Sequence, residues 1–209
     1  MDSAAKPAAV ILAGGRSSRM NGHDKSLVLL AGKPLVAHVI ERLSVQTAAI
    51  AINANGNASR FATFALPVIA DTVEDLPGPL AGILAGLEWA AGIGASHVFS
   101  IPTDTPFFPK DVIARLAELP GASRQPALAI SGGRRHPAIG LWPVSLAGQL
   151  RDFLAARTTF KVSVFADRCD AASVDFPMVS VGGRQIDPFF NVNTPDDLAA
   201  AEAMLKDMR

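Results

Sequence analysis

The sequence predicts a three-layer α/β/α sandwich built on a doubly wound, mostly parallel sheet. Apolar runs of strand length alternate along the chain with longer segments of helical period. The first run, Ala8–Ala13 (AAVILA), is almost continuously apolar, as strands buried on both faces are. The segments between the runs are long enough for the crossovers that parallel strands require. Together these observations favour a sheet covered by helices on both faces.

The first half of the chain shows this alternation most clearly. After the first strand, a helix is expected from Pro34 to Val45, because proline suits a first helical turn and the apolar residues share one stripe (Leu35, Val39, Ile40 and Leu43). The elements expected next are a strand at 48–53, a short helix at 57–64, a strand at 67–70, a small-residue helix at 79–91, a strand at 97–102 and a helix at 109–119.

The second half is less regular. Strands are expected at 127–130 and 138–142, on either side of a basic turn at 132–135. A helix at 146–156 follows, and a closing helix is expected at 194–208 with Thr194 as its N-cap. No repeat or linker divides the chain, so we expect one domain over residues 1–209.

Composition limits the classes of function. Of 209 residues, 49% are hydrophobic and 18% are charged, which suits a chain with a large buried core. Nineteen basic residues balance nineteen acidic ones, so neither nucleic acid nor an anionic membrane is an expected partner. Cys169 is the only cysteine, which excludes an internal disulfide and a cysteine-rich zinc site. The apolar run at 8–13 is too short for a signal-peptide core, and we expect a cytoplasmic protein.

Ligand-type residues stand at the end of each of the first four expected strands. They are Gly14 and Gly15, Asn53, Asp71, and Asp104. In open α/β sheets, ligands bind outside the carboxyl ends of the strands, so four such ends favour a ligand crevice. For each position alone, an ordinary turn residue is an equally good interpretation.

The loop after the first strand carries the strongest local pattern. It reads Leu-Ala-Gly-Gly-Arg-Ser-Ser-Arg-Met over 12–20, and Asp24 and Lys25 follow. Adjacent glycines let successive backbone N–H groups face phosphate oxygens, which Arg19 and Lys25 could also reach. No Gly-Lys-Ser/Thr follows, and a dinucleotide fingerprint would need a third glycine. The pattern favours phosphate binding over a glycine-rich turn with solvated basic residues.

This loop resembles the opening signature of the molybdenum cofactor guanylyltransferases, which belong to the pyrophosphorylase-like nucleotidyltransferases. The resemblance continues in order along nearly the whole chain, through the motifs at 53–55, Asp71, 77–82, 102–106, 136–137 and 191–195. It implies a Rossmann-like nucleotidyltransferase fold, with a nucleotide-binding N-terminal half and an acceptor-binding C-terminal half. The chain departs from the family pattern at Asn21, where glycine is usual after Arg-Met, and at Phe160, where a second basic residue often precedes Lys161.

The resemblance also implies roles for individual residues. Leu12, Ala13 and Gly14 would contact the base and ribose of GTP through backbone atoms, with Gly15 completing the loop. Asn53 and Asp71 would hold the guanine or the ribose, and Gly78 and Gly82 would leave room for the purine. Lys25 would contact the triphosphate, and Asp104 would coordinate Mg²⁺.

The acceptor side is less sharply defined. Candidate contacts to the acceptor are His136, Lys161, Asn191 and Asn193, although a histidine before a proline also suits a structural role. Asn191 and Asn193 are also candidates for binding a second metal ion. Asn191 and Asn193 could equally belong to a strand that leads into the last helix. Further basic residues could gather around the acceptor phosphate or form a solvated face (Arg134, Arg135, Arg157 and Arg168).

The implied reaction joins GMP from GTP to the terminal phosphate of molybdopterin and releases pyrophosphate. A phosphate monoester is already dianionic near neutral pH, since its second pKa is about 6, so no general base is needed. The difficulty lies in bringing together two anions, and Mg²⁺, Lys25, Arg19 and Asp104 are the candidates for overcoming it. We expect a monomer that makes transient contact with molybdopterin-handling or molybdoenzyme-maturation proteins.

Other functions remain open on the sequence alone. The nearest are cytidylyl transfer to the molybdenum cofactor and nucleotidyl transfer to a sugar phosphate. Gly14 and the Asp24-Lys25 pair favour guanine, because the cytidylyl enzymes typically have alanine at the position of Gly14 and lack the aspartate before the loop lysine. A glycosyltransferase would normally carry an Asp-x-Asp pair, and Thr103-Asp104-Thr105 offers one carboxylate. A nucleotide-responsive binding protein without catalysis is the third class.

Overall fold

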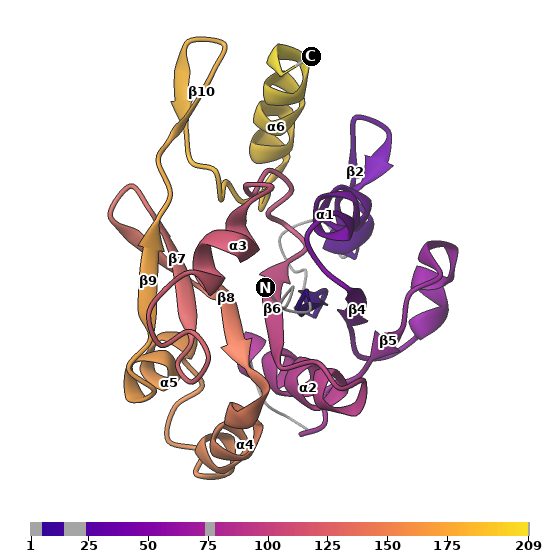
Figure 1. The fold of residues 1–209 in the computed structure, drawn as a ribbon. Coiled ribbons are helices and arrows are strands. Elements are labelled where there is room, and N and C mark those ends of the chain that lie inside the picture. Colours follow the sequence, from indigo (N-terminus) through magenta and orange to yellow (C-terminus); the bar gives the residue numbers. More distant parts are fainter. Residues whose placement is uncertain (1–5, 15–23, 74–77, 209) are drawn as a thin grey trace.

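A computed structural model of the chain describes residues 6–14, 24–73 and 78–208 (Figure 1). It confirms the expected sandwich: a seven-stranded sheet lies at its centre, in the order β5-β4-β1-β6-β8-β7-β9. All neighbouring strands pair in parallel except β8, which is antiparallel to both of its neighbours. The strands are β1 (Ala8–Leu12), β4 (Ala49–Asn53), β5 (Val68–Ile69), β6 (His97–Pro102), β7 (Ala127–Ser131), β8 (Arg134–Pro143) and β9 (Ala172–Asp175).

Helices cover both faces of this sheet, as Figure 1 shows. One face packs against α1 (Leu35–Ser44) and α3 (Val112–Ala117), and the other packs against α2 (Pro79–Gly92), α4 (Ala147–Ala155) and α5 (Val162–Arg168). Strand β1 supplies both layers because alternate side chains point to opposite faces. Ala9 and Ile11 belong to the first hydrophobic cluster, and Val10 and Leu12 belong to the second.

Helix α2 lies unusually close to β1. A Cβ atom on Gly86 would stand 2.6 Å from Cγ1 of Val10, so a glycine at this position is what permits the contact. The close approach matters for function because it sets the start of α2 against the ends of β1 and β4.

Several elements differ from the sequence expectation. The short helix expected at 57–64 is a 3₁₀ helix, η2 (Ala58–Phe64), and the helix expected at 146–156 begins as η3 (Val144–Leu146) before α4. The two strands expected around the basic turn are present and pair antiparallel, but β8 reaches back to Arg134. No element had been assigned to α5, β9 or three shorter features: η1 (Lys25–Leu27) and the hairpins β2 (Leu29–Leu30) with β3 (Lys33–Pro34) and β10 (Val179–Val181) with β11 (Arg184–Ile186).

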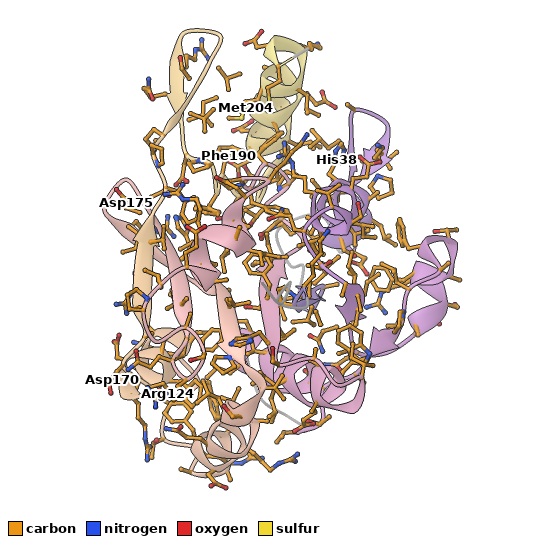
Figure 2. All side chains as sticks on the ribbon, in the orientation of Figure 1. His38, Arg124, Asp170, Asp175, Phe190 and Met204 are labelled. Atoms are coloured by element: carbon orange, nitrogen blue, oxygen red, sulfur yellow. The ribbon has the colours of Figure 1, made fainter. Side chains whose placement is uncertain are left out.

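The closing helix α6 (Pro195–Asp207) lies beside the β10–β11 hairpin at the upper edge of the molecule in Figure 1. A third hydrophobic cluster holds it, and Figure 2 shows Phe190 below the helix with Met204 on it. Among the described residues, no helix is both long enough and apolar enough to cross a lipid bilayer.

Candidate active site

The carboxyl ends of three central strands lie side by side. Leu12, the last residue of β1, is in register with Asn53 of β4 and with Pro102 of β6. The next residues continue this contact, since the N–H of Ala13 donates to the carbonyl of Asn53 at 2.9 Å, and that of Thr103 donates to the carbonyl of Leu12 at 3.3 Å. The polar side chains predicted from separate strand ends therefore share one edge of the sheet.

Asn53, Asn55 and Asp71 form an amide–carboxylate corner at this edge. The Nδ2 atom of Asn53 donates to Oδ1 of Asp71 at 2.8 Å, and that of Asn55 donates to Oδ2 of Asp71 at 2.7 Å. The amide oxygen of Asn55 in turn accepts from the backbone N–H of Asp71 at 2.9 Å. Each group holds the next, so the orientation of the Asp71 carboxylate is set before any ligand arrives. Such an arrangement suits recognition of the donors and hydroxyls of a nucleoside.

Two of the predicted glycines lie at the start of α2, and one of them, Gly82, borders this corner. A Cβ atom on Gly82 would lie 2.2 Å from the amide oxygen of Asn53 and 2.9 Å from Cδ2 of Leu12. The space at Gly82 is therefore used by the Asn53 side chain, which is 3% exposed. Gly78 adopts a positive φ of 96°, and its position for a Cβ lies 3.8 Å from the carbonyl oxygen of Phe160. The role of the two glycines in leaving room for a purine stays a prediction.

A second cluster joins Lys25, Asp104, Asn191 and Asn193. The Lys25 ammonium donates to Oδ2 of Asp104 and to the amide oxygen of Asn193, both at 2.5 Å. Oδ1 of Asp104 accepts from Nδ2 of Asn191 at 2.8 Å. The Lys25 and Asp104 side chains are each 20% exposed, so the pair is sheltered but open to a ligand. Residues predicted for the triphosphate, the metal and the acceptor thus lie together.

The cap of α6 positions Asn193. Oδ2 of Asp197 accepts from the backbone N–H of both Asn193 and Thr194 at 2.9 Å, and Thr194 Oγ1 accepts from the N–H of Asp197 at 3.2 Å. This capping box confirms Thr194 as the N-cap. Burial acts to raise the pKa of Asp197, but the hydrogen bonds from Asn193 and Thr194 outweigh it and leave that pKa lowered. The cap is therefore held by a charged carboxylate.

Arg60 connects the two clusters. Its Nη1 donates to the backbone carbonyls of Asn55 at 3.1 Å and Asn57 at 2.8 Å. Its Nε lies 2.7 Å from Oδ2 of Asp24, as an ion pair without the alignment of a hydrogen bond. Asp24 caps η1, the turn that carries Lys25. The side chain therefore ties the lysine turn to the amide–carboxylate corner.

His136 lies on β8, next to the end of β7, and is 7% exposed. Its Nε2 is 2.6 Å from Oγ of Ser131 and 3.8 Å from Oδ2 of Asp187. The single hydroxyl proton of Ser131 goes to Oδ1 of Asp187 at 2.6 Å, so the histidine donates to the serine from a protonated Nε2. Burial is the main cause that lowers the pKa of His136, Arg134 adds to it, and Asp187 opposes it. The structure thus gives His136 a partner within the fold, and its contact with an acceptor stays a prediction.

Two of the other predicted basic residues lie at helix α5. Lys161 is exposed at the N-cap of α5, next to Phe160, whose carbonyl approaches Gly78. Arg135 pairs with Asp167. Arg19 and Gly15, the remaining loop residues of the predicted site, lie outside the described residues.

Sequence reasoning missed Asn55, Arg60, Ser131 and Asp187 as parts of this region. Asn55 carried a usable signal, because it stands two residues after Asn53 at the same strand end. The other three carried none, since their roles depend on partners that are distant in sequence.

The chain is similar to known proteins over most of its length. The model of a family described as the MobA-like NTP transferase domain matches residues 9–172. A relative from Mesorhizobium japonicum, called molybdenum cofactor guanylyltransferase, is 46% identical over 206 residues, which are 96% of this chain and 97% of that protein. A relative of the same name from Rhodopseudomonas palustris (strain BisB5) is 47% identical over 205 residues, covering 96% and 95%.

Among solved structures, molybdopterin-guanine dinucleotide biosynthesis protein A from Archaeoglobus fulgidus superimposes with a TM-score of 0.72. The match covers 95% of this chain and 98% of that one, at 23% sequence identity. At this identity the likeness establishes the shared fold.

Proposed function

The chain belongs to the MobA-like NTP transferase family, and from that premise we propose that it transfers GMP from GTP to the terminal phosphate of molybdopterin. The observation that carries the proposal is the meeting of Lys25, Asp104 and Asn193 at the carboxyl edge of the sheet. This cluster and the Asn53–Asp71 corner lie at the same edge of the sheet, so that edge offers a charged group for the phosphates and an amide–carboxylate group for the nucleoside.

The donor atoms at the cluster suit Mg²⁺. Asp104 offers a carboxylate and Asn193 an amide oxygen, which are the hard oxygen ligands this ion takes. Among the described residues, no three His, Cys, Asp or Glu side chains gather as a protein-only metal cage. Mg²⁺ commonly binds through one or two carboxylates together with substrate phosphates and water. When bound, it would neutralise phosphate charge and polarise the α-phosphate.

The reaction needs two changes in bonding. A bond forms between an oxygen of the acceptor phosphate and the α-phosphorus of GTP, while the bond from that phosphorus to the bridging oxygen of the β-phosphate breaks. Pyrophosphate leaves with the electron pair of the broken bond. We expect the Lys25 ammonium to exchange its contact with Asp104 for the phosphate oxygens, where it offsets their negative charge.

The protein supplies position and charge rather than proton transfer. The attacking phosphate is dianionic near neutral pH, and so needs no base to activate it. The corner of Asn53 and Asp71 would hold the nucleoside, and the backbone of Ala13 and Gly14 would line its path toward Lys25. Holding the two reactants in line lowers the entropic part of the barrier.

Steady-state turnover with molybdopterin and each nucleoside triphosphate tests the proposal. We expect pyrophosphate to form with GTP, and kcat/KM with GTP to exceed that with CTP or ATP by at least about tenfold, which corresponds to about 1.4 kcal/mol. Higher kcat/KM with CTP would identify a cytidylyltransferase instead. In a parallel assay that supplies a nucleotide sugar, release of the nucleoside diphosphate would indicate a glycosyltransferase. Binding of nucleotide without turnover would indicate a regulatory protein.

A further inference from the structure

The segment 187–193 is fastened at both of its ends, and the two fastenings belong to different parts of the fold. Its far end delivers Asn191 and Asn193 to the active-site cluster. Its near end, Asp187, contacts neither Lys25 nor Asp104 and is bound instead to the β7–β8 pair.

We propose that Asp187 is a positioning residue for nucleotidyl transfer, which acts by anchoring the segment that carries Asn191 and Asn193. The inference rests on the proposed function, and it adds a residue to which neither the sequence nor the family resemblance assigned a role.

The anchor at Asp187 is specific: its side chain is 30% exposed, and the side chains that it contacts are buried. Oδ1 accepts from Oγ of Ser131 at 2.6 Å and from the backbone N–H of Phe189 at 2.8 Å. Oδ2 lies 3.8 Å from Nε2 of His136. Ser131 is 1% exposed, so loss of the carboxylate would leave a buried hydroxyl without one of its partners. Hydrogen bonds to a charged group are the stronger class, which suits an anchor.

Between the two ends of the segment, the ring of Phe189 packs against two other aromatic side chains. The Phe189 ring lies 4.8 Å from that of His136 and stands edge-on to that of Phe176 at 5.2 Å. Its side chain is 1% exposed. Because Phe189 follows Asp187 by two residues, the carboxylate that caps its N–H also sets the direction in which the chain leaves β11.

The far end, at residues 191–193, is held by hydrogen bonds from the backbone as well as from side chains. The N–H of Val192 donates to the carbonyl of Asp104 at 2.8 Å, and Nδ2 of Asn191 donates to Oδ1 of the same residue. Asn193 then reaches the Lys25 ammonium at 2.5 Å. Three residues lie between Asp187 and Asn191, so a change in the position of the anchor is transmitted over a short stretch of chain.

A double-mutant cycle separates positioning from general stability. We expect Asp187→Ala to lower kcat/KM for GTP by about tenfold or more, the effect typical of removing a partner that orients a ligand residue. Asp187→Asn keeps an oxygen that can accept from Ser131 and Phe189, and should recover activity to within about threefold of the wild type. Asp175→Ala, at an exposed carboxylate that ends β9, is the matched control and should leave kcat/KM unchanged.

The decisive comparison is made in a background in which both Asn191 and Asn193 are replaced by alanine. If Asp187 acts through this segment, Asp187→Ala should cost less than about twofold there, because both side-chain contacts that it positions are already absent. If the two losses multiply, or if Asp187→Ala alone is as active as the wild type, the proposal is wrong.

The rate of amide hydrogen exchange tests the anchor without a measurement of turnover. In Asp187→Ala the amide of Val192 should exchange at least about tenfold faster, while amides of β1 keep their protection. Unchanged exchange at Val192 would overturn the anchor. A wild-type protein that makes no pyrophosphate would overturn the proposed function alone, because the exchange result stands independently of activity.

Discussion

At the residue scale, the site depends on one carboxylate, that of Asp104, which is shared between a cation and an amide. Both oxygens of Asp104 accept hydrogen bonds, one from Lys25 and one from Asn191. Paired in this way, the carboxylate can hold a charge at a partly buried position where an unpaired charge would be costly. A ligand that supplies its own metal and phosphates would replace these partners with stronger ones.

Substitution of Asp104 tests this role. Asp104→Asn keeps the shape of the side chain but removes its negative charge, and we expect kcat to fall by about 100-fold or more. Asp167→Asn, which removes a carboxylate paired with Arg135 outside the site, is the control and should retain full activity. Intact turnover in Asp104→Asn would rule out a metal role for this residue.

His136 should make stability depend on pH. Its pKa is lowered in the fold, so folding favours the neutral ring. The contribution to stability is therefore fully present above the unfolded pKa of about 6.5 and is lost as the pH falls through that value toward the folded pKa. His136→Gln keeps an N–H donor for Ser131 but cannot titrate.

The measurement is urea unfolding at pH 7.5 and at pH 5.5. We expect the free energy of unfolding to fall between these two values of pH by more in the wild type than in His136→Gln. An equal fall in both proteins would show that the buried ring is not the titrating group.

At the scale of elements, the start of α2 packs tightly against the ends of β1 and β4 and borders the amide–carboxylate corner at Asn53. Gly82→Ala should push the Asn53 amide away, because the added Cβ would stand 2.2 Å from its oxygen. We expect KM for GTP to rise about tenfold or more, with a smaller effect on KM for the acceptor.

Gly92→Ala, at the other end of the same helix, is the matched control. No atom lies within 4 Å of its new Cβ, and alanine favours helix over glycine, so activity and stability should be kept or slightly raised. If Gly82→Ala binds GTP as the wild type does, Asn53 has no part in holding the nucleoside.

The elements that the sequence predicted share a local cause. Strand β1 is a continuous apolar run, and the N-cap at Thr194 is formed by residues that are close in sequence, so both could be identified without knowledge of the fold. Helix α5 could not, because Val162 and its neighbours have low helical propensity and tertiary packing holds the helix: Phe165 and Ala166 are fully buried. Strand β9 depends on pairing with β7, forty-five residues away, which no local pattern reveals.

The candidate site divides in the same way. Asn53, Asp71 and Asp104 could be found because each follows a strand end, and the topology of a parallel sheet brings such ends together. The contact between Lys25 and Asn193 spans 168 residues and was not predicted, because the two residues had been given separate roles. The burial of His136 could not be anticipated, since it depends on Ser131 and Asp187 from separate segments.

At the scale of the whole molecule, the N-terminal and C-terminal portions of the chain meet at the carboxyl edge of the sheet. The N-terminal portion contributes the amide–carboxylate corner and Lys25. The segment 187–193, close to the C-terminus, places Asn191 and Asn193 at the same edge. A site of this kind forms when the fold is complete, so changes in the C-terminal segment should affect nucleotide chemistry as well as acceptor contacts.

The central claim is that this edge binds GTP with Mg²⁺, with the nucleoside at Asn53 and Asp71 and the metal at Asp104. A crystal structure of the protein with GTP and Mg²⁺ tests it most directly. The account predicts metal density at the Asp104 carboxylate and Lys25 on the phosphates. A nucleotide bound elsewhere, or a metal away from the end of β6, would contradict it.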